Sequence, residues 1–137
     1  RVDTAAVEQA ARRLVAELER RGCEVVVVEV ADGLFQRETA QLLASPSWRA
    51  ALHGALFAAA DAMGAVAGVQ RLQAQGWRVL AFTGVVTASP LAAAEAEAAL
   101  ASSDATVPSV TREALRDPDV ARRLAGLPQT ARLPLAA

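Results

Sequence analysis

The chain has 137 residues, of which 53% are hydrophobic and 21% charged, a composition that excludes intrinsic disorder and suits one domain with a buried core. Its formal net charge is −1, from 14 basic and 15 acidic residues, which argues against a dedicated nucleic-acid-binding protein. The only cysteine, Cys23, excludes an intrachain disulfide framework and a cysteine-based zinc cluster. No apolar run is long enough to cross a bilayer. We expect a cytoplasmic protein with neither nucleic acid nor membrane as a partner.

All the basic residues are arginines, and the chain contains no Lys, Asn, Ile or Tyr. A GC-rich genome is the simplest explanation for these absences. Without a lysine, the chain cannot itself supply an ammonium group for a phosphate or a Schiff base. It begins at Arg1 rather than at a methionine, so we expect a processed or truncated product.

The first part of the chain predicts a helix followed by a buried strand. Apolar residues recur at helical spacing from Asp3 to Arg21, with Asp3 or Thr4 as the cap and Gly22 at the exit. Residues 24–30 (EVVVVEV) contain four consecutive valines. Such a run is typical of a central strand that is buried on both faces of a parallel sheet.

The rest of the chain alternates between apolar runs and capped helical patterns. We expect short helices over 38–43 and from Ser45-Pro46 to 52, strands over 54–60 and 77–83, helices over 61–75 and 90–101, a short edge strand over 105–110, two short helices over 111–124, and a tail over 126–137. Strands that alternate with helices form βαβ units. The sequence therefore predicts one α/β domain over 1–137, with a parallel sheet of about four strands and helices on both faces.

Ligands of open α/β sheets bind beyond the carboxyl ends of the strands, and Glu29 and Asp32 fall at such a place. A carboxylate at the tip of a buried strand is costly unless it binds a cation or a hydrogen-bond partner. The two acids could hold Mg²⁺ together with water molecules. Alternatively, Glu29 points to solvent or pairs with an arginine such as Arg37.

Other polar residues have simpler interpretations. Asp61 and Ser89 each precede a predicted helix as N-caps, although a helix N-terminus can also receive an anion. His53 is the only histidine and is interpreted as structural or exposed, and Cys23 as a buried, inert thiol. The sequence contains neither GxSxG nor the glycine patterns GxGxxG and GxxxxGKS/T.

The order of the motifs resembles dethiobiotin synthetase-like P-loop NTPases. Residues 26–34 (VVVEVADGL) resemble the family's strand and loop VVEGAGGL. Residues 57–66 (FAAADAMGAV), Leu72 and residues 76–82 (GWRVLAF) are similar to its next unit: a strand, an LGTINH-like helix start, a glycine and a strand ending in GVVLN. The resemblance covers about residues 5 to 125, and its motifs are short.

This resemblance implies an ATP- and Mg²⁺-dependent fold that activates a carboxylate or carbamate by phosphorylation, with a homodimer as the expected assembly. Glu29 would be the catalytic acid near the metal, with Asp32 beside it as a second metal ligand and catalytic residue. Residues implied to bind the nucleotide or acceptor are Gly33, Thr83, Ser89, Pro108 and Val110. Asp32 and Leu34 depart from the family's glycine-rich loop, and Thr83 stands where the family usually has an adenine-reading asparagine.

The family's phosphate loop, with its lysine, lies upstream of everything matched here. We therefore expect the chain to be the C-terminal part of a longer P-loop domain, inactive without its phosphate-loop segment. In the family's topology the missing strand separates residues 24–30 from residues 54–60. Either the remaining strands close up in a different order or another polypeptide segment fills the gap, and we favour the second. The alternative is a non-catalytic α/β module that binds a protein or a small molecule. A receiver-like domain is disfavoured, because its chemistry needs a lysine late in the chain.

Overall fold

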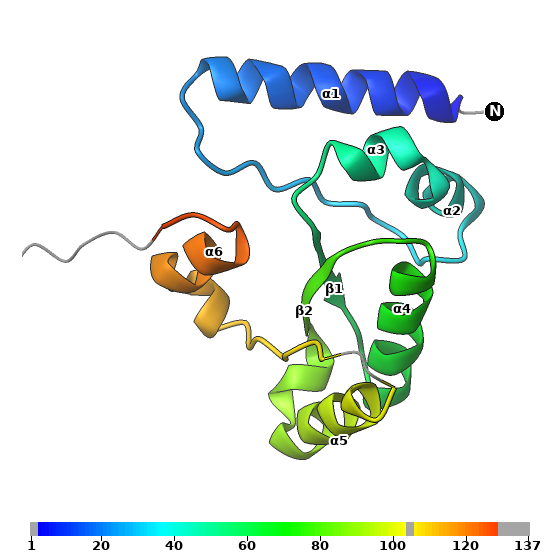
Figure 1. Cartoon of the computed structure of the whole chain (residues 1–137), viewed down its shortest axis with the longest axis vertical. Helices are drawn as coiled ribbons and strands as arrows, with labels where there is room; N and C mark the ends of the chain where they lie inside the picture. Colours follow the sequence, from blue (N-terminus) through cyan, green and yellow to red (C-terminus); the bar gives the residue numbers. More distant parts are fainter. Residues whose placement is uncertain (1–2, 104–105, 129–137) are drawn as a thin grey trace, which may run out of the picture. The chain divides into compact units, whose positions relative to one another are not determined.

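The computed structural model describes residues 3–103 and 106–128 (Figure 1). The chain divides into two compact units, Arg1–Leu52 (unit 1) and His53–Ala137 (unit 2). In the described part of the chain, unit 1 contains only helices and connecting segments, whereas both β-strands belong to unit 2. Of the predicted tail over 126–137, residues 129–137 lie outside the described residues. No described helix has both the length and the hydropathy needed to cross a bilayer.

The helices of unit 1 begin and end where local sequence signals place them. Helix α1 (Thr4–Arg20) is capped by the Asp3 carboxylate, which accepts a hydrogen bond from Ala5 N at 3.0 Å. Gly22, with φ +83°, follows this helix. Helices α2 (Arg37–Ala44) and α3 (Pro46–Ala50) follow, and the Ser45 hydroxyl caps α3. The predictions of these helices are confirmed.

The predicted strand over residues 24–30 is wrong. These residues form a stretched connection from α1 to α2 (Figure 1), without helix or strand pairing. Nor is the segment buried on both faces, because the side chain of Val27 is 87% exposed. A strand requires a neighbour that accepts and donates its backbone hydrogen bonds, and no described residue provides one here.

Unit 2 contains one βαβ unit, as the sequence predicts. Strands β1 (Ala55–Ala58) and β2 (Val79–Thr83) are parallel, with Phe57 opposite Phe82. Between them lies helix α4 (Ala62–Ala74), whose cap is the Asp61 carboxylate, 2.7 Å from Gly64 N. The rest of unit 2 comprises a 3₁₀ helix η1 (Val85–Ala88), α5 (Pro90–Ala101), η2 (Ala114–Arg116) and α6 (Pro118–Leu124).

The core of unit 2 lies between this strand pair and helices α4 and α5. Its buried members come from α4, β2, η1, α5 and the segment after α5: Ala65, Val69, Phe82, Val86, Ala96, Leu100 and Val107. Helix α4 approaches β1 closely at Gly68, where a Cβ atom would lie only 2.1 Å from Phe57 Cε1. Glycine at this position therefore allows the helix to pack on the phenylalanine ring.

The predicted four-stranded sheet with helices on both faces is also wrong. The chain is mixed α/β and mostly helical, and its described part contains a single sheet of two parallel strands. Residue 105 of the predicted edge strand over 105–110 lies outside the described residues, and residues 106–110 contribute only an isolated parallel bridge between Ser109 and Phe82. Pro108 has no N–H to extend such a ladder. The valine segment, defined here as Val25–Val30, adds no strand at all.

Candidate functional site

The carboxyl ends of β1 and β2 are joined by backbone hydrogen bonds. Ala59 N donates to the Thr83 carbonyl at 2.9 Å, and Val86 N donates to the Ala59 carbonyl at 3.2 Å. Gly84 lies in the chain between Thr83 and Val86 and has φ +102°. A Cβ atom at this position would lie 2.5 Å from the Ala59 oxygen. Only glycine suits this position, because both the backbone conformation and the space exclude a side chain.

The nucleotide-binding residues predicted in unit 2 lie close to this edge. Thr83, the last residue of β2, is 9% exposed. Phe82 N donates to the Pro108 carbonyl at 3.0 Å, and Val110 N donates to the Phe82 carbonyl at 2.9 Å. Pro108 and Val110 therefore run directly alongside the end of β2. The structure brings Pro108 and Val110 to the end of β2, although the sequence places them 25 and 27 positions after Thr83.

Ser89 has a structural role in the described fold. Its hydroxyl accepts a hydrogen bond from Ala92 N at 3.3 Å and caps α5. Asp61 does the same for α4. The capping interpretation of both residues is confirmed, and anion binding at these helix starts stays a prediction.

Glu97, on α5, is a residue of this edge that the sequence does not single out. Its Oε1 accepts a hydrogen bond from Ser109 N at 2.6 Å, and so fixes the segment that runs beside β2. The only sequence signal for this residue is an acidic position on a helix that is otherwise rich in alanine. That signal does not reveal a partner twelve residues away.

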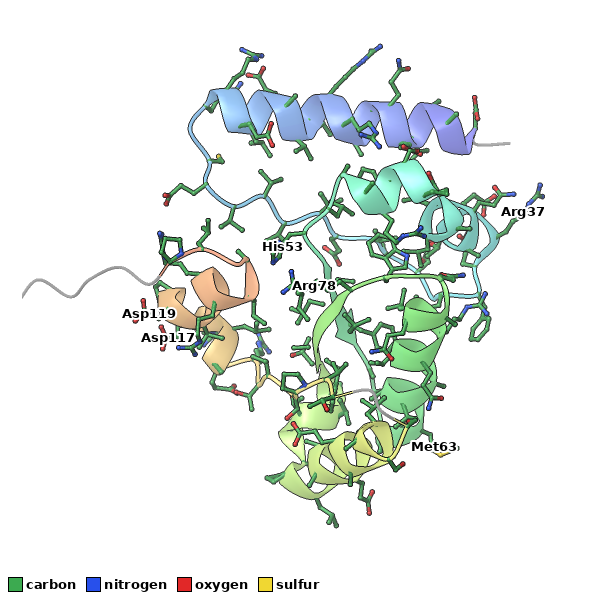
Figure 2. All side chains as sticks on the ribbon, in the orientation of Figure 1. Arg37, His53, Met63, Arg78, Asp117 and Asp119 are labelled. Carbon is green, nitrogen blue, oxygen red and sulfur yellow. The ribbon has the colours of Figure 1, made fainter. Side chains whose placement is uncertain are left out.

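The predicted metal ligands belong to unit 1. Glu29 and Asp32 are both exposed, and neither makes an ion pair with a residue that the structure describes. The pairing of Glu29 with Arg37 is therefore not observed among the described side chains, and Arg37 is exposed at the start of α2 (Figure 2). Asp32 has φ +70°, an uncommon conformation for a residue other than glycine. Gly33 accepts a hydrogen bond from Gln36 N at 2.9 Å, in the turn that leads into α2.

The chemistry of these two acids suits a hard cation that keeps several water molecules, such as Mg²⁺. Over residues 3–103 and 106–128, however, no three His, Cys, Asp or Glu side chains gather into a metal-binding group. A metal held by Glu29 and Asp32 would therefore need further ligands from water or from a substrate.

Unit 1 contains a cavity of about 280 Å³ beside the valine segment. Its lining combines residues of α1, the connection, α2 and α3: Val7, Ala11, Val28, Glu29, Val30, Ala31, Glu38, Thr39, Leu42 and Trp48. Trp48 is 1% exposed, and its indole Nε1 has no hydrogen-bond partner among the described residues. Burying a donor without a hydrogen-bond partner costs free energy. The unpaired Trp48 N–H is therefore an unusual feature of the residues that line this cavity.

Two further predictions can be compared with the structure. His53 is exposed, and its Nε2 lies 3.4 Å from Arg78 Nη1 (Figure 2), in agreement with a surface position. Cys23 is exposed, so the prediction of a buried thiol is wrong. The cysteine precedes the valine segment, which is not the buried strand that the sequence predicts.

Comparisons with family models, with curated proteins and with solved structures find no match for this chain.

Proposed function

We propose that this chain is the C-terminal part of an ATP- and Mg²⁺-dependent protein that resembles the dethiobiotin synthetase-like P-loop NTPases. A phosphate-loop segment outside this chain would complete it. The observation that supports this proposal is the position of Pro108 and Val110 beside Thr83 at the carboxyl edge of the β1–β2 pair. That edge is where open α/β sheets bind their ligands.

The chain's residues would contribute mainly to binding and positioning. Thr83 and residues 108–110 would flank the adenine, although a threonine hydroxyl makes fewer hydrogen bonds than the amide that it replaces. Glu29 and Asp32 would hold Mg²⁺, which when bound neutralises phosphate charge. Gly33 leaves the adjacent backbone accessible, because it has no side chain. Ser89 would keep α5 in place through its cap.

The phosphate loop and its lysine would come from the missing segment, since this chain contains no lysine. Electrostatic stabilisation by that loop and the metal would be the main catalytic contribution. We propose a homodimer as the working assembly and the cytoplasm as its location, as the resemblance and the composition imply.

A non-catalytic α/β module that binds a protein or a small molecule is the second candidate. The absence of lysine from the sequence favours it for the isolated chain, because nothing here can replace the phosphate-loop ammonium group. In such a module Glu29 would have no catalytic role.

The two candidates are separated by co-expressing the chain with the polypeptide encoded upstream of Arg1 and measuring Mg²⁺-ATP binding and hydrolysis. For an enzyme, we expect Glu29→Gln to lower turnover by about 100-fold or more without unfolding the protein. The matched control Glu19→Gln, at an exposed position of α1, should leave turnover unchanged. A folded assembly that binds no nucleotide would exclude the enzyme and leave the module.

A further inference from the structure

The valine segment has the amino-acid composition of a β-strand, but no other strand pairs with it in the described part of the chain. Val25–Val30 make no backbone hydrogen bond with any residue that the structure describes. Six consecutive residues with unpaired N–H and C=O groups offer a ready template for another strand. Valine is also among the residues that pack best on a pleated surface.

Burial along this segment alternates in its first part with the period of a strand. Val26 and Val28 are half-buried within unit 1, whereas Val25 and Val27 are exposed. A period of two is the signature of a chain that turns one face towards a core and the other towards solvent. The first four valines thus turn alternate side chains towards a core, as the residues of a half-buried strand do.

The cavity beside the segment provides a place for a side chain of such a strand. Its volume of about 280 Å³ is sufficient for an aliphatic side chain, and most of its lining residues are apolar. Trp48 lines this cavity, and its Nε1–H has no partner in the described chain. A side chain that enters the cavity would therefore pack against the Trp48 ring.

We propose that unit 1 binds an extended segment of another polypeptide as a β-strand along Val25–Val30. Main-chain hydrogen bonds would provide affinity, and a side chain placed in the cavity would provide specificity, as in other cases of strand addition. The proposal stands on unit 1 alone and does not require ATP binding.

Charge indicates which kind of strand this surface accepts. Residues 24–31 carry two acids, Glu24 and Glu29, and no basic residue. If a second copy of the same segment were the added strand, the pair would carry two more carboxylates. Like charges on paired strands are destabilising. The partner inferred here is an apolar strand with arginine or lysine at its ends.

The test uses the full chain labelled with ¹⁵N and the peptide acetyl-Arg-Val-Thr-Val-Thr-Val-Arg-amide. We expect the peptide to slow amide exchange over Val25–Val30 and to shift the indole signal of Trp48 but not that of Trp77, the other tryptophan of the chain. An analogue with glutamate in place of both arginines should bind at least about fivefold more weakly, since like charges oppose pairing.

Three variants link binding to the proposed contacts. Val27→Pro removes one backbone donor and should weaken peptide binding about tenfold, whereas the β-branched Val27→Thr should retain it. Trp48→Phe replaces the indole that lines the cavity by a smaller ring, so it should weaken binding about threefold to tenfold. The amide spectrum of each variant without peptide establishes that it is folded.

Three outcomes would overturn the proposal. The peptide could leave the exchange of Val25–Val30 unchanged, or it could bind Val27→Pro as tightly as the unaltered chain. Alternatively, protection of Val25–Val30 that rises with protein concentration in the absence of peptide would identify a second copy as the occupant. ATP binding is not measured in any of these experiments, so their failure leaves the proposed function unaffected.

Discussion

At the scale of single residues, the clearest electrostatic feature is Glu8 in unit 1. Its carboxylate accepts hydrogen bonds from the Ser47 hydroxyl at 2.7 Å and the Ser45 hydroxyl at 2.8 Å. Arg12, one turn along α1, donates to the same carboxylate at 3.0 Å and also to the Ser47 carbonyl. These bonds link α1 to the start of α3, and they stabilise the ionised form of Glu8.

We predict that Glu8 makes the stability of unit 1 depend on pH. The hydrogen bond from Ser47, then that from Ser45, and then Arg12 hold the pKa of Glu8 below its usual value, against the opposing effect of burial. A lowered pKa in the folded state stabilises the protein above the unfolded value of about 4.3, and this contribution is lost as the pH falls through the folded pKa.

Urea unfolding of the unaltered chain and Glu8→Gln at several pH values tests this prediction. The difference in the free energy of unfolding should be largest near pH 7 and shrink below about pH 4. Glu19→Gln, on the same helix, is the control and should show no such convergence. A difference that stays constant from pH 7 to pH 3 would contradict the prediction.

At the scale of elements, α4 packs closely on β1 in unit 2. The helix has glycine at Gly64, near its start, and at Gly68, in its middle. Gly68 is buried and faces the Phe57 ring, whereas Gly64 is exposed and lies near only the Asp61 carboxylate. Replacing each of the two glycines by alanine therefore separates the effect of helix propensity on stability from the effect of packing.

We predict that Gly68→Ala destabilises unit 2 by about 1–3 kcal/mol, because the added methyl group forces the Phe57 ring to move. Gly64→Ala should change stability by less than about 1 kcal/mol, since alanine favours the helix while the capping Asp61 must shift slightly. Urea unfolding of both substitutions in a Trp48→Phe background, followed by Trp77 fluorescence, measures both values. Equal effects of the two substitutions would show that the Phe57 contact does not limit the helix.

Prediction from the sequence succeeded for elements that local signals define and failed for those that depend on distant partners. Helix caps such as Asp3, Ser45 and Asp61 act within three residues, so the helices were predicted close to their observed bounds. A strand exists only when another segment pairs with it, and the four valines carry no information about that segment. For this reason the predicted sheet had too many strands.

In the candidate site, too, features set by local sequence signals could be predicted, whereas those that depend on distant residues could not. The cap at Ser89 is local and could be predicted from the sequence. The position of Thr83 at the carboxyl end of a strand could be predicted from the apolar run over 77–83, whereas its proposed part in nucleotide binding comes only from the family resemblance. Nothing in the sequence indicated the Glu97–Ser109 hydrogen bond or the unsatisfied Trp48 donor, because each depends on residues that are distant along the chain.

At the scale of the whole molecule, buried side chains are concentrated in unit 2. Its core contains Phe82, Leu100 and five other buried residues, whereas Trp48, Leu42 and Leu43 are the large buried side chains in the described part of unit 1. The free energy from apolar burial is roughly proportional to the area removed from water. Apolar burial therefore contributes more to the free energy of folding in unit 2 than in unit 1.

We predict that unit 1 unfolds at a lower urea concentration than unit 2. The two tryptophans allow a direct measurement, because Trp48 belongs to unit 1 and Trp77 to unit 2. Trp77→Phe leaves only the Trp48 signal, and Trp48→Phe leaves only that of Trp77. Circular dichroism of each variant corrects for any loss of stability caused by the substitution. Coincident midpoints for the two signals would instead indicate a single cooperative transition.

The exposed Cys23 has a practical consequence for all of these experiments. It is the chain's sole thiol and lies two residues before Val25. A maleimide dye or a nitroxide will therefore attach at one known position, with no engineered cysteine. The rotational mobility of the attached dye or nitroxide would report directly on whether the neighbouring valines become ordered when a partner binds.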